Sequence, residues 1–397
     1  MQQRSNRLAI VTQDPLNRGG VLRLAAYIYQ RATAAGLDAS LVHYASFKGW
    51  PQLSVSLMNA AHGRFSISPK AEHYEFEAMH AIAIGARFPE WEPQRLAANP
   101  LWRSTLAEFD KAILVTGSAH TGYPLAALEM PFVAWVSSTV ADDRRARLAK
   151  PEGLGMRIER MGIKRVRDAE CRVLEAATKV LAVSDDAKKS IAAEASPKLI
   201  EVWPFPIDTS KFTADTKTSR KRQLLFVGRA HDPRKRIGLF LEAAEKLLSQ
   251  PEFSDVRLAV VSSVPIPLEI VDRYPRLADR IDLYKEISND ALAELYATSA
   301  ALIISSEQEG LSIASMEAMA SGTPVISTRC GGPEMLIADG VTGFLVNPTA
   351  EDICSRAAEV LTKTKNARTM GAAASQRIEE RFSEAVWNEK FETMLAS

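Results

Sequence analysis

Apolar residues follow two different patterns along most of this chain. Short, mostly apolar runs such as Leu8–Thr12 and Ala301–Ile304 alternate with longer segments in which apolar residues recur every three or four positions. Short apolar runs are typical of strands buried on both faces of a parallel sheet, and the longer period is typical of amphipathic helices. The pattern therefore predicts an α/β protein built from repeated strand–helix–strand units.

The alternation of strands and helices is interrupted near residues 204–212 and then restarts. Pro204 and Pro206 stiffen this segment, and Asp208 is expected to have a capping role there rather than a catalytic one. We predict two doubly wound domains, residues 1–203 and 204–380.

The predicted strands are Leu8–Thr12, Ala39–Tyr44, Ala112–Thr116, Phe132–Val136, Val180–Val183, Leu224–Val227, Leu258–Val261, Asp282–Tyr284, Ala301–Ile304 and Pro324–Ile326. The predicted helices are Val21–Ala35, Arg157–Ala177, Ile237–Leu248, Asp290–Ala297, 313–320 and Phe382–Leu395. Residues 47–99 show no clear periodicity.

The composition narrows the class of protein. A chain of 397 residues is long for one core and fits two domains of ordinary size. A formal net charge of +1 predicts neither a nucleic-acid binder nor an acidic tail. The three cysteines lack metal-ligand spacing and are too few for a disulfide framework, which fits a reducing cytoplasm. No apolar stretch approaches the roughly 18 residues that span a bilayer, so we expect a soluble protein or one held at a membrane surface.

The most informative segment lies between two predicted strands, at residues 305–323. Glu309 is expected in the loop at the carboxyl end of a strand, and Glu317 on the second turn of the next helix. Ser312 is the predicted N-cap of that helix. Leu311 and Met316 have the spacing of a hydrophobic staple, and Gly322 is expected to leave the helix with a positive φ.

Ligands of open α/β sheets bind at the carboxyl ends of the strands. The free amides of Ile313 and Ala314 would face a phosphate group, and the two carboxylates would accept hydrogen bonds from sugar hydroxyls. A nucleotide sugar carries both kinds of group. A solvated helix with surface glutamates is the alternative interpretation of this spacing.

A group of cations follows the first predicted strand of the second domain. Gly228 and Arg229 end that strand, and Arg234, Lys235 and Arg236 come before the next helix. Arginine and lysine neutralise phosphate oxygens and the charge that develops on a leaving diphosphate. Arg234 competes with Lys235 for this role, and a basic solvated loop is the alternative.

The order of these motifs resembles glycosyltransferase family 4, the group 1 glycosyl transferases. The resemblance rests on Glu309-Gly310-Leu311, Met316–Ala320, Gly322–Ile326, Gly331–Glu334 and Asp339–Val346, together with the Gly-Arg…Lys run. It implies the GT-B fold, in which two Rossmann-like domains face a central cleft and the terminal helix, here residues 381–397, crosses back to the first domain. It also implies retaining, metal-independent transfer of a hexosyl group from a nucleoside-diphosphate sugar to a hydroxyl of a glycan, glycolipid or other acceptor.

The resemblance assigns roles to residues by their place in the motifs. Arg229 and Lys235 would stabilise the leaving diphosphate, Glu309 would hold the donor sugar, and Glu317 would hold the ribose. No metal ligand and no cofactor is expected, and the donor is UDP-, GDP- or ADP-linked. The first-domain glycine loop matches Gly19-Gly20, with Arg18 beside it, and residues 47–99 fall on the variable acceptor side. The other predicted donor contacts are Gly228, Lys285, Ile287, Gly310, Leu311, Ser312 and Ile313.

His120 is the candidate acid, base or sugar contact of the first domain. It lies in a glycine-bounded loop after the strand that ends at Thr116, where an imidazole can reach a reacting oxygen. A structural histidine is the alternative. Many family members carry a histidine after the next strand, where this chain has Ser137, so Ser137 or His120 would take its place.

Residues 144–172 hold ten lysines and arginines against four acidic residues. We weigh three interpretations: an exposed helix packed on its own sheet, a helix on an anionic membrane surface, and a surface for an anionic acceptor. For the whole chain, a nucleotide-sugar-binding pseudoenzyme and a sugar-nucleotide epimerase are the alternatives to a transferase.

Overall fold

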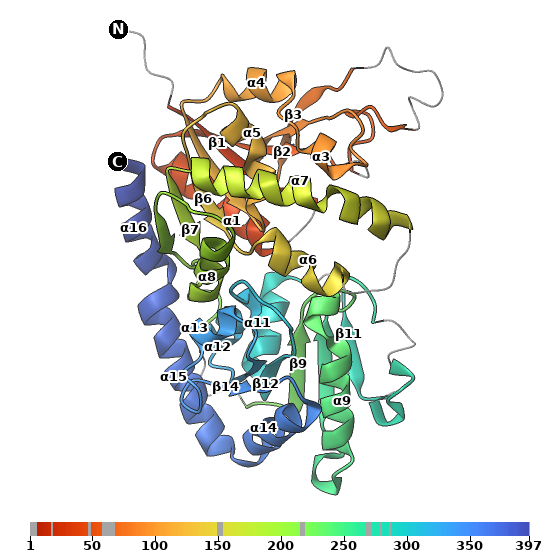
Figure 1. Ribbon diagram of the computed structural model, residues 1–397. Helices are drawn as coiled ribbons and strands as arrows, with labels where there is room; N and C mark the ends of the chain where they lie inside the picture. Colours follow the sequence, from red (N-terminus) through yellow and green to blue (C-terminus); the bar gives the residue numbers. More distant parts are fainter. Residues whose placement is uncertain are drawn as a thin grey trace. The chain divides into compact units, whose positions relative to one another are not determined.

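The computed structural model describes residues 6–16, 19–46, 49–57, 68–148, 154–214, 219–266, 271–277, 279–285 and 287–396. The chain divides into two compact units, Met1–Trp203 and Pro204–Ser397. Each unit contains one sheet with helices packed on it, so the α/β class predicted from the sequence is confirmed (Figure 1). None of the helices in these ranges has the length and apolar character needed to cross a bilayer.

The first unit is built on an eight-stranded sheet in the order β3-β4-β2-β1-β5-β6-β7-β8. All neighbouring strands are parallel except β3 and β4. Its strands are β1 (Arg7–Thr12), β2 (Asp38–Tyr44), β3 (Ala71–Phe76), β4 (Met79–Ile84), β5 (Lys111–Thr116), β6 (Phe132–Val136), β7 (Lys179–Ala182) and β8 (Ile200–Val202). Its helices are α1 (Gly20–Ala34), α3 (Glu92–Arg95), α4 (Pro100–Leu106), the 3-10 turn η1 (Ala119–Gly122), α5 (Tyr123–Ala127), α6 (Val140–Leu148), α7 (Leu154–Ala176) and α8 (Asp185–Glu194).

The second unit is built on a six-stranded parallel sheet in the order β11-β10-β9-β12-β13-β14. Its strands are β9 (Gln223–Val227), β10 (Arg257–Val261), β11 (Ile281–Tyr284), β12 (Ala301–Ile304), β13 (Val325–Thr328) and β14 (Phe344–Val346). Its helices are η2 (Pro233–Lys235), α9 (Ile237–Leu248), η3 (Pro251–Phe253), η4 (Pro275–Leu277), α11 (Asn289–Thr298), α12 (Ile313–Ala320), α13 (Gly332–Leu336), α14 (Ala350–Thr362), α15 (Thr364–Phe382) and α16 (Glu384–Ala396).

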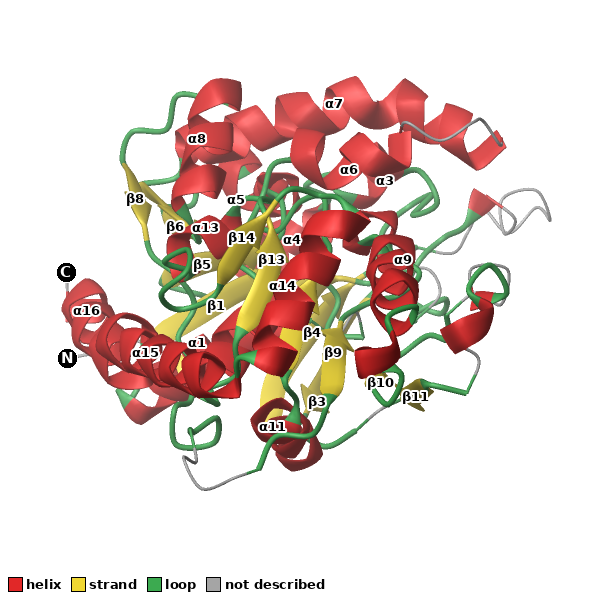
Figure 2. Ribbon diagram, turned by 90° about the horizontal axis from the view of Figure 1, so that it is seen from below, coloured by secondary structure: helices red, strands yellow, loops and turns green. Residues whose placement is uncertain are grey.

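Burial of the central strands explains why they form here. Ile10 of β1, Leu114 of β5 and Ile303 of β12 are fully buried, and burying such a side chain stabilises the fold by about 1.5–3 kcal/mol. In the first unit α7 packs against α5 and α6 (Figure 1). In the second, α14 packs against α9 and the strands β12, β13 and β14 (Figure 2). Each sheet is therefore covered by amphipathic helices, as the long hydrophobic period predicts.

The sequence did not reveal the β3–β4 hairpin. Its strands lie inside residues 47–99, where no periodicity was found, and Glu77 and Ala78 join them with φ values of 48° and 63°. Asn and Gly are the usual residues for such a turn, so no turn signal marks this hairpin. The hairpin extends the sheet because β4 pairs in parallel with β2.

The segment after Trp203 is anchored to the end of α15. The amide of Ile207 donates to the carbonyl of Phe382 at 2.9 Å. The carboxylate of Asp208 accepts from the amides of Ser210 and Lys211 at 3.0 and 3.1 Å, which confirms its capping role. The predicted boundary at residue 380 falls inside α15, and residues 381–397 belong to the second compact unit. The crossing of the terminal helix onto the first unit stays a prediction.

Candidate active site

The cationic loop and the acidic loop of the second unit follow adjacent strands. Strand β9 pairs with β10 on one side and with β12 on the other, so the strand order reverses between β9 and β12. In open parallel sheets, ligands bind beside the carboxyl ends of the strands where this reversal occurs. The loops at residues 228–236 and 305–312 lie at this point.

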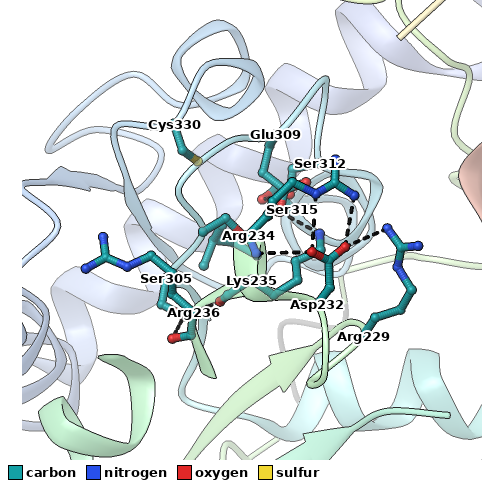
Figure 3. A network of polar contacts seen from close by, with 12 residues as sticks. Arg229, Asp232, Arg234, Lys235, Arg236, Ser305, Glu309, Ser312, Ser315 and Cys330 are labelled. Atoms are coloured by element: carbon teal, nitrogen blue, oxygen red, sulfur yellow. Dashed lines mark hydrogen bonds and ion pairs between the residues drawn. The ribbon is translucent and has the colours of Figure 1, made fainter. Parts of the chain in front are cut away.

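Lys235 and Glu309 join these two loops directly. The Lys235 ammonium lies 2.6 Å from Oε1 of Glu309 (Figure 3). The same oxygen accepts from the Ser306 hydroxyl at 2.6 Å. The Glu309 carboxylate is buried, and the stem of Lys235 lies beside the backbone of Gly228. Two residues predicted from separate motifs therefore form one ion pair.

Asp232 organises the two arginines of the cationic loop. Its Oδ2 accepts from Nη2 of Arg229 and from Nη2 of Arg234, both at 2.9 Å (Figure 3). Burial raises the pKa of Asp232, but Arg234 and Arg229 outweigh this effect and lower the pKa to about 2. Arg234 therefore pairs with Asp232, whereas Lys235 pairs with Glu309. Sequence reasoning missed Asp232, although its place three residues after Arg229 could have signalled the pair.

The backbone around Glu309 is fixed by the loop before α13. The Glu309 amide donates to the carbonyl of Cys330 at 2.7 Å, and the Gly332 amide donates to the carbonyl of Glu309 at 2.8 Å. A Cβ atom at Gly332 would lie 2.4 Å from Cα of Leu311, so only glycine permits this approach. Glu334 holds the same loop by accepting from the Gly331 amide at 2.6 Å. These contacts give Glu309 a fixed position.

Glu317 lies on the second turn of α12, as predicted, and is 2% exposed. Its Oε2 accepts a hydrogen bond from the Tyr296 hydroxyl at 2.9 Å. Its role as a ribose contact stays a prediction.

The start of α12 differs from its prediction in one respect. Ser312 is the N-cap residue, but its backbone is left-handed with φ 70° and its side chain caps no amide. Its hydroxyl instead lies 2.7 Å from the hydroxyl of Ser315. The carbonyl of Ser312 accepts from the amides of Ser315 and Met316. Within the described residues, the amides of Ile313 and Ala314 donate to no acceptor. The positive φ expected at Gly322 is confirmed at 71°.

The remaining predicted donor contacts are more scattered. Gly310 and Leu311 lie next to Glu309, and Ile313 begins α12. Lys285 is exposed and Ile287 half-buried after β11, which is separated from β9 by β10. In the part of the chain that the structure describes, neither contacts the ion pair.

In the first unit, the strand order reverses between β1 and β5. Gly19 precedes α1 and Gly20 begins it, at the end of the loop after β1, and Arg18 lies outside the described residues. His120 lies in η1 after β5 and is 7% exposed. Its Nε2 is 3.4 Å from Oε1 of Glu92, which also accepts from Nη2 of Arg144 at 2.7 Å.

Sequence reasoning also missed Glu92 and Arg144. They come from segments 28 residues before and 24 residues after His120, and no spacing rule joins them. Ser137 follows β6, and its amide donates to the carbonyls of Thr116 and Gly117. Among the described residues, no group of three or more His, Cys, Asp or Glu side chains is arranged to hold a metal ion.

Comparisons with known proteins concern the fold and the family of this chain. Solved structures that superpose on the whole chain include sucrose-phosphate synthase from Thermosynechococcus elongatus, with a TM-score of 0.75, 17% identity and 98% of both chains covered. They also include Anabaena HepE in complex with UDP-glucose, with a TM-score of 0.71, 15% identity, and 98% of this chain and 99% of that chain covered. The two parallel-sheet units therefore have the GT-B fold that these solved structures share.

Within that class, residues 221–363 match the family described as "Glycosyl transferases group 1". The chain is 27% identical over 308 residues to MMP alpha-(1->4)-mannosyltransferase of Mycolicibacterium hassiacum, covering 75% of this chain and 73% of that protein. It is 29% identical over 226 residues to D-inositol 3-phosphate glycosyltransferase of Kribbella flavida, covering 52% of this chain and 53% of that protein. The match thus spans about half the length of this second relative. The second unit therefore carries a region similar to group 1 glycosyl transferases, and the chain is similar to proteins named as glycosyltransferases.

Proposed function

We propose that this chain is a retaining, metal-independent glycosyltransferase that moves a hexosyl group from a nucleoside-diphosphate sugar to an acceptor hydroxyl. The observation that carries the proposal is the 2.6 Å contact between Lys235 and Glu309. It brings a phosphate-binding cation and a sugar-binding carboxylate together where the strand order of the second sheet reverses. In a nucleotide sugar the diphosphate is bonded through an oxygen atom to the hydroxyl-rich ring, so these two groups also lie next to each other.

The cations are expected to stabilise the leaving group. Arg229 and Lys235 each pair with a carboxylate in the ligand-free chain. A diphosphate brings its own negative charges, so it can replace Asp232 and Glu309 as the partner of these cations. Their attraction grows as the bond from the sugar to the diphosphate breaks, because that step adds negative charge to the leaving oxygen. This is the role that a bound metal ion has in other transferases.

Glu309 is expected to act on the sugar. Released from Lys235, its carboxylate would accept hydrogen bonds from sugar hydroxyls and stabilise the positive charge on the anomeric carbon. For retention, the acceptor hydroxyl attacks from the face that the diphosphate leaves. The carbon–phosphate oxygen bond breaks, the new glycosidic bond forms, and the acceptor proton passes to the leaving phosphate oxygen. Glu317 would hold the ribose, and His120 would contact a substrate hydroxyl from the first unit.

The donor and the acceptor are proposed in general terms. HepE, which shares the fold, has been solved with UDP and with UDP-glucose, which supports a UDP-sugar ahead of a GDP- or ADP-sugar. We also propose a cytoplasmic protein. The described part of α7 exposes Arg160, Met161 and Lys164, which is compatible with peripheral contact to an anionic membrane.

The proposal is tested with a panel of UDP-, GDP- and ADP-sugars. The wild-type chain is incubated with each donor, a mixture of glycan and lipid-linked acceptors, and EDTA. Mass spectrometry detects transfer or slow donor hydrolysis, and NMR of the product gives the anomeric configuration. We expect turnover of one donor family in EDTA, with the anomeric configuration of the donor retained.

Two variants link the activity to the ion pair. Glu309→Gln removes the charge that faces the sugar and should lower kcat by roughly 100-fold or more. Lys235→Met should weaken binding of the nucleoside diphosphate as well as kcat. Glu307→Gln is the matched control, because Glu307 is an exposed carboxylate two residues from Glu309. An inverted product, a requirement for added metal, or equal losses in Glu307→Gln and Glu309→Gln would refute the proposal.

A further inference from the structure

Two carboxylates that are not among the predicted site residues, Glu92 and Glu170, contact His120 or the segments that carry it. Glu92 begins α3, His120 lies in η1, Arg144 lies on α6, and Glu170 lies near the end of α7. Glu170 and Arg144 are 1% and 5% exposed. Charged side chains are rarely buried to this extent unless they are paired. The arrangement is therefore built by four separate segments of the first unit.

Glu170 fixes the two backbone segments that carry His120 and Arg144. Its Oε1 accepts from the amide of Ala119 at 3.1 Å, and both of its oxygens accept from the amide of Val140, at 3.1 and 2.9 Å. Ala119 directly precedes His120, and Val140 begins the helix that carries Arg144. One buried carboxylate thus sets the separation of these segments.

Glu92 then fixes the side chains. Its Oε1 accepts from Nη2 of Arg144 at 2.7 Å and lies 3.4 Å from Nε2 of His120. Burial raises the pKa of Glu92, but the contacts with His120 and Arg144 outweigh it and hold the pKa well below its usual range. Glu92 is therefore a carboxylate at neutral pH, and a carboxylate beside one imidazole nitrogen keeps the proton on that nitrogen.

The other nitrogen of His120 has no partner. Nδ1 is buried, and no donor or acceptor reaches it in the described part of the chain. With the proton on Nε2, Nδ1 is a hydrogen-bond acceptor. Leaving such a buried group unsatisfied is unfavourable, and a ligand that donates a hydrogen bond to Nδ1 removes this cost.

We propose that Glu92 and Glu170 are positioning residues that hold His120 with Nδ1 ready to accept a hydrogen bond from a substrate hydroxyl. The identity of that hydroxyl, a sugar or polyol hydroxyl, rests on the proposed function. The position and tautomer of the imidazole do not, because they follow from contacts in the ligand-free chain. The inference is therefore testable without any turnover.

The first experiment measures the tautomer of His120 by NMR in chain labelled with ¹⁵N-histidine, at pH 8. His120→Gln assigns its signals among the six histidines. We expect the proton on Nε2 in the wild type and in Glu92→Gln, whose amide oxygen still accepts, and a mixture of tautomers in Glu92→Ala. A proton on Nδ1 in the wild type, or an unchanged signal in Glu92→Ala, would overturn the inference.

The second experiment measures kinetics with the donor identified above. Glu92→Ala should raise the KM of the substrate whose hydroxyl meets Nδ1 by about tenfold, and Glu92→Gln should restore most of it. The dissociation constant of the nucleoside diphosphate should change less than twofold, because no contact of His120 with that ligand is proposed. Glu90→Gln, at an exposed carboxylate two residues away, is the control. If Glu92→Ala changes KM no more than this control does, the positioning role is refuted.

The two experiments separate the inference from the proposed function. If the wild type turns over no donor while the NMR result holds, the proposed function fails and the assignment of the imidazole stands. If the wild type is active but the tautomer is wrong, the inference alone fails.

Discussion

Glu170 makes the stability of the first unit depend on pH in a direction opposite to that of most carboxylates. Burial raises its pKa from 4.5 to about 7, although the amides of Val140 and Ala119 lower the pKa in part. The folded chain therefore keeps a proton on Glu170 at pH values where the unfolded chain has lost it. A group with a raised folded-state pKa favours folding below pH 4.5, and this contribution is lost as the pH rises through about 7.

The magnitude follows from the size of the pKa shift. A shift from 4.5 to about 7 corresponds to about 3.4 kcal/mol, at 1.36 kcal/mol for each pKa unit. Between pH 5 and pH 8 the part that titrates is about 2.5 kcal/mol. This is a large share of the roughly 5–15 kcal/mol by which domains are stable. The effect is therefore measurable against the contributions of other groups.

The assay is urea unfolding of the wild type and Glu170→Gln at pH 5, 6, 7 and 8. Tryptophan fluorescence reports mainly the first unit, because five of the six tryptophans lie in it: Trp50, Trp91, Trp102, Trp135 and Trp203. Glu170→Gln keeps an oxygen that accepts from the Ala119 and Val140 amides but cannot ionise. The wild type should lose about 2.5 kcal/mol more than this variant between pH 5 and pH 8.

Glu175→Gln is the control for this prediction. Glu175 is exposed on the same helix, so the substitution changes the net charge equally without removing a buried carboxylate. The control should follow the wild type at every pH. If Glu170→Gln and the wild type show the same dependence on pH, the raised pKa of Glu170 is wrong.

Two further predictions concern the second unit. Tyr296→Phe removes the hydroxyl that lies 2.9 Å from the buried Oε2 of Glu317, so urea unfolding should show a loss of about 2 kcal/mol, and an unchanged midpoint would contradict this. Gly371→Ala places a Cβ atom 1.8 Å from the carbonyl oxygen of Gly322. Because backbone has to move, thermal unfolding should report a loss of about 1–3 kcal/mol, whereas Ala372→Ser, at an exposed neighbour, should change stability by about 0.5 kcal/mol or less.

The central strands were predictable because they are buried on both faces. Burial on both faces leaves an uninterrupted apolar run, and the helix Ile237–Leu248 has the expected bounds because its apolar face is continuous. Strand β3 has partly exposed side chains of mixed character, and an exposed strand leaves no such run. Edge strands of this kind are recognised from their pairing partner, which a sequence does not show.

The candidate site was predictable only where its chemistry lies in one segment. Lys235 and Glu309 each stand in a run that resembles a family motif, and the structure joins them. Asp232 and Glu92 carry no motif, and the partners of Glu92 come from distant segments. Ser312 shows the same limit in another form. Its residue type predicts a capping side chain, but its backbone is left-handed and its hydroxyl reaches Ser315 instead.

In both units, the cations of the candidate site residues are paired with carboxylates. Lys235 and Arg144 each lie within 2.7 Å of a carboxylate, since a buried or half-buried cation without a partner is costly. The more exposed Arg229 also pairs with a carboxylate, at 2.9 Å. In the second unit these carboxylates stand where the diphosphate is proposed to bind, so binding would replace a carboxylate with a phosphate as the partner of each cation. In the first unit Glu92 and Arg144 satisfy each other, and the unsatisfied group is the neutral nitrogen of His120. The second unit is therefore suited to a charged ligand group, and the site around His120 to a neutral hydroxyl.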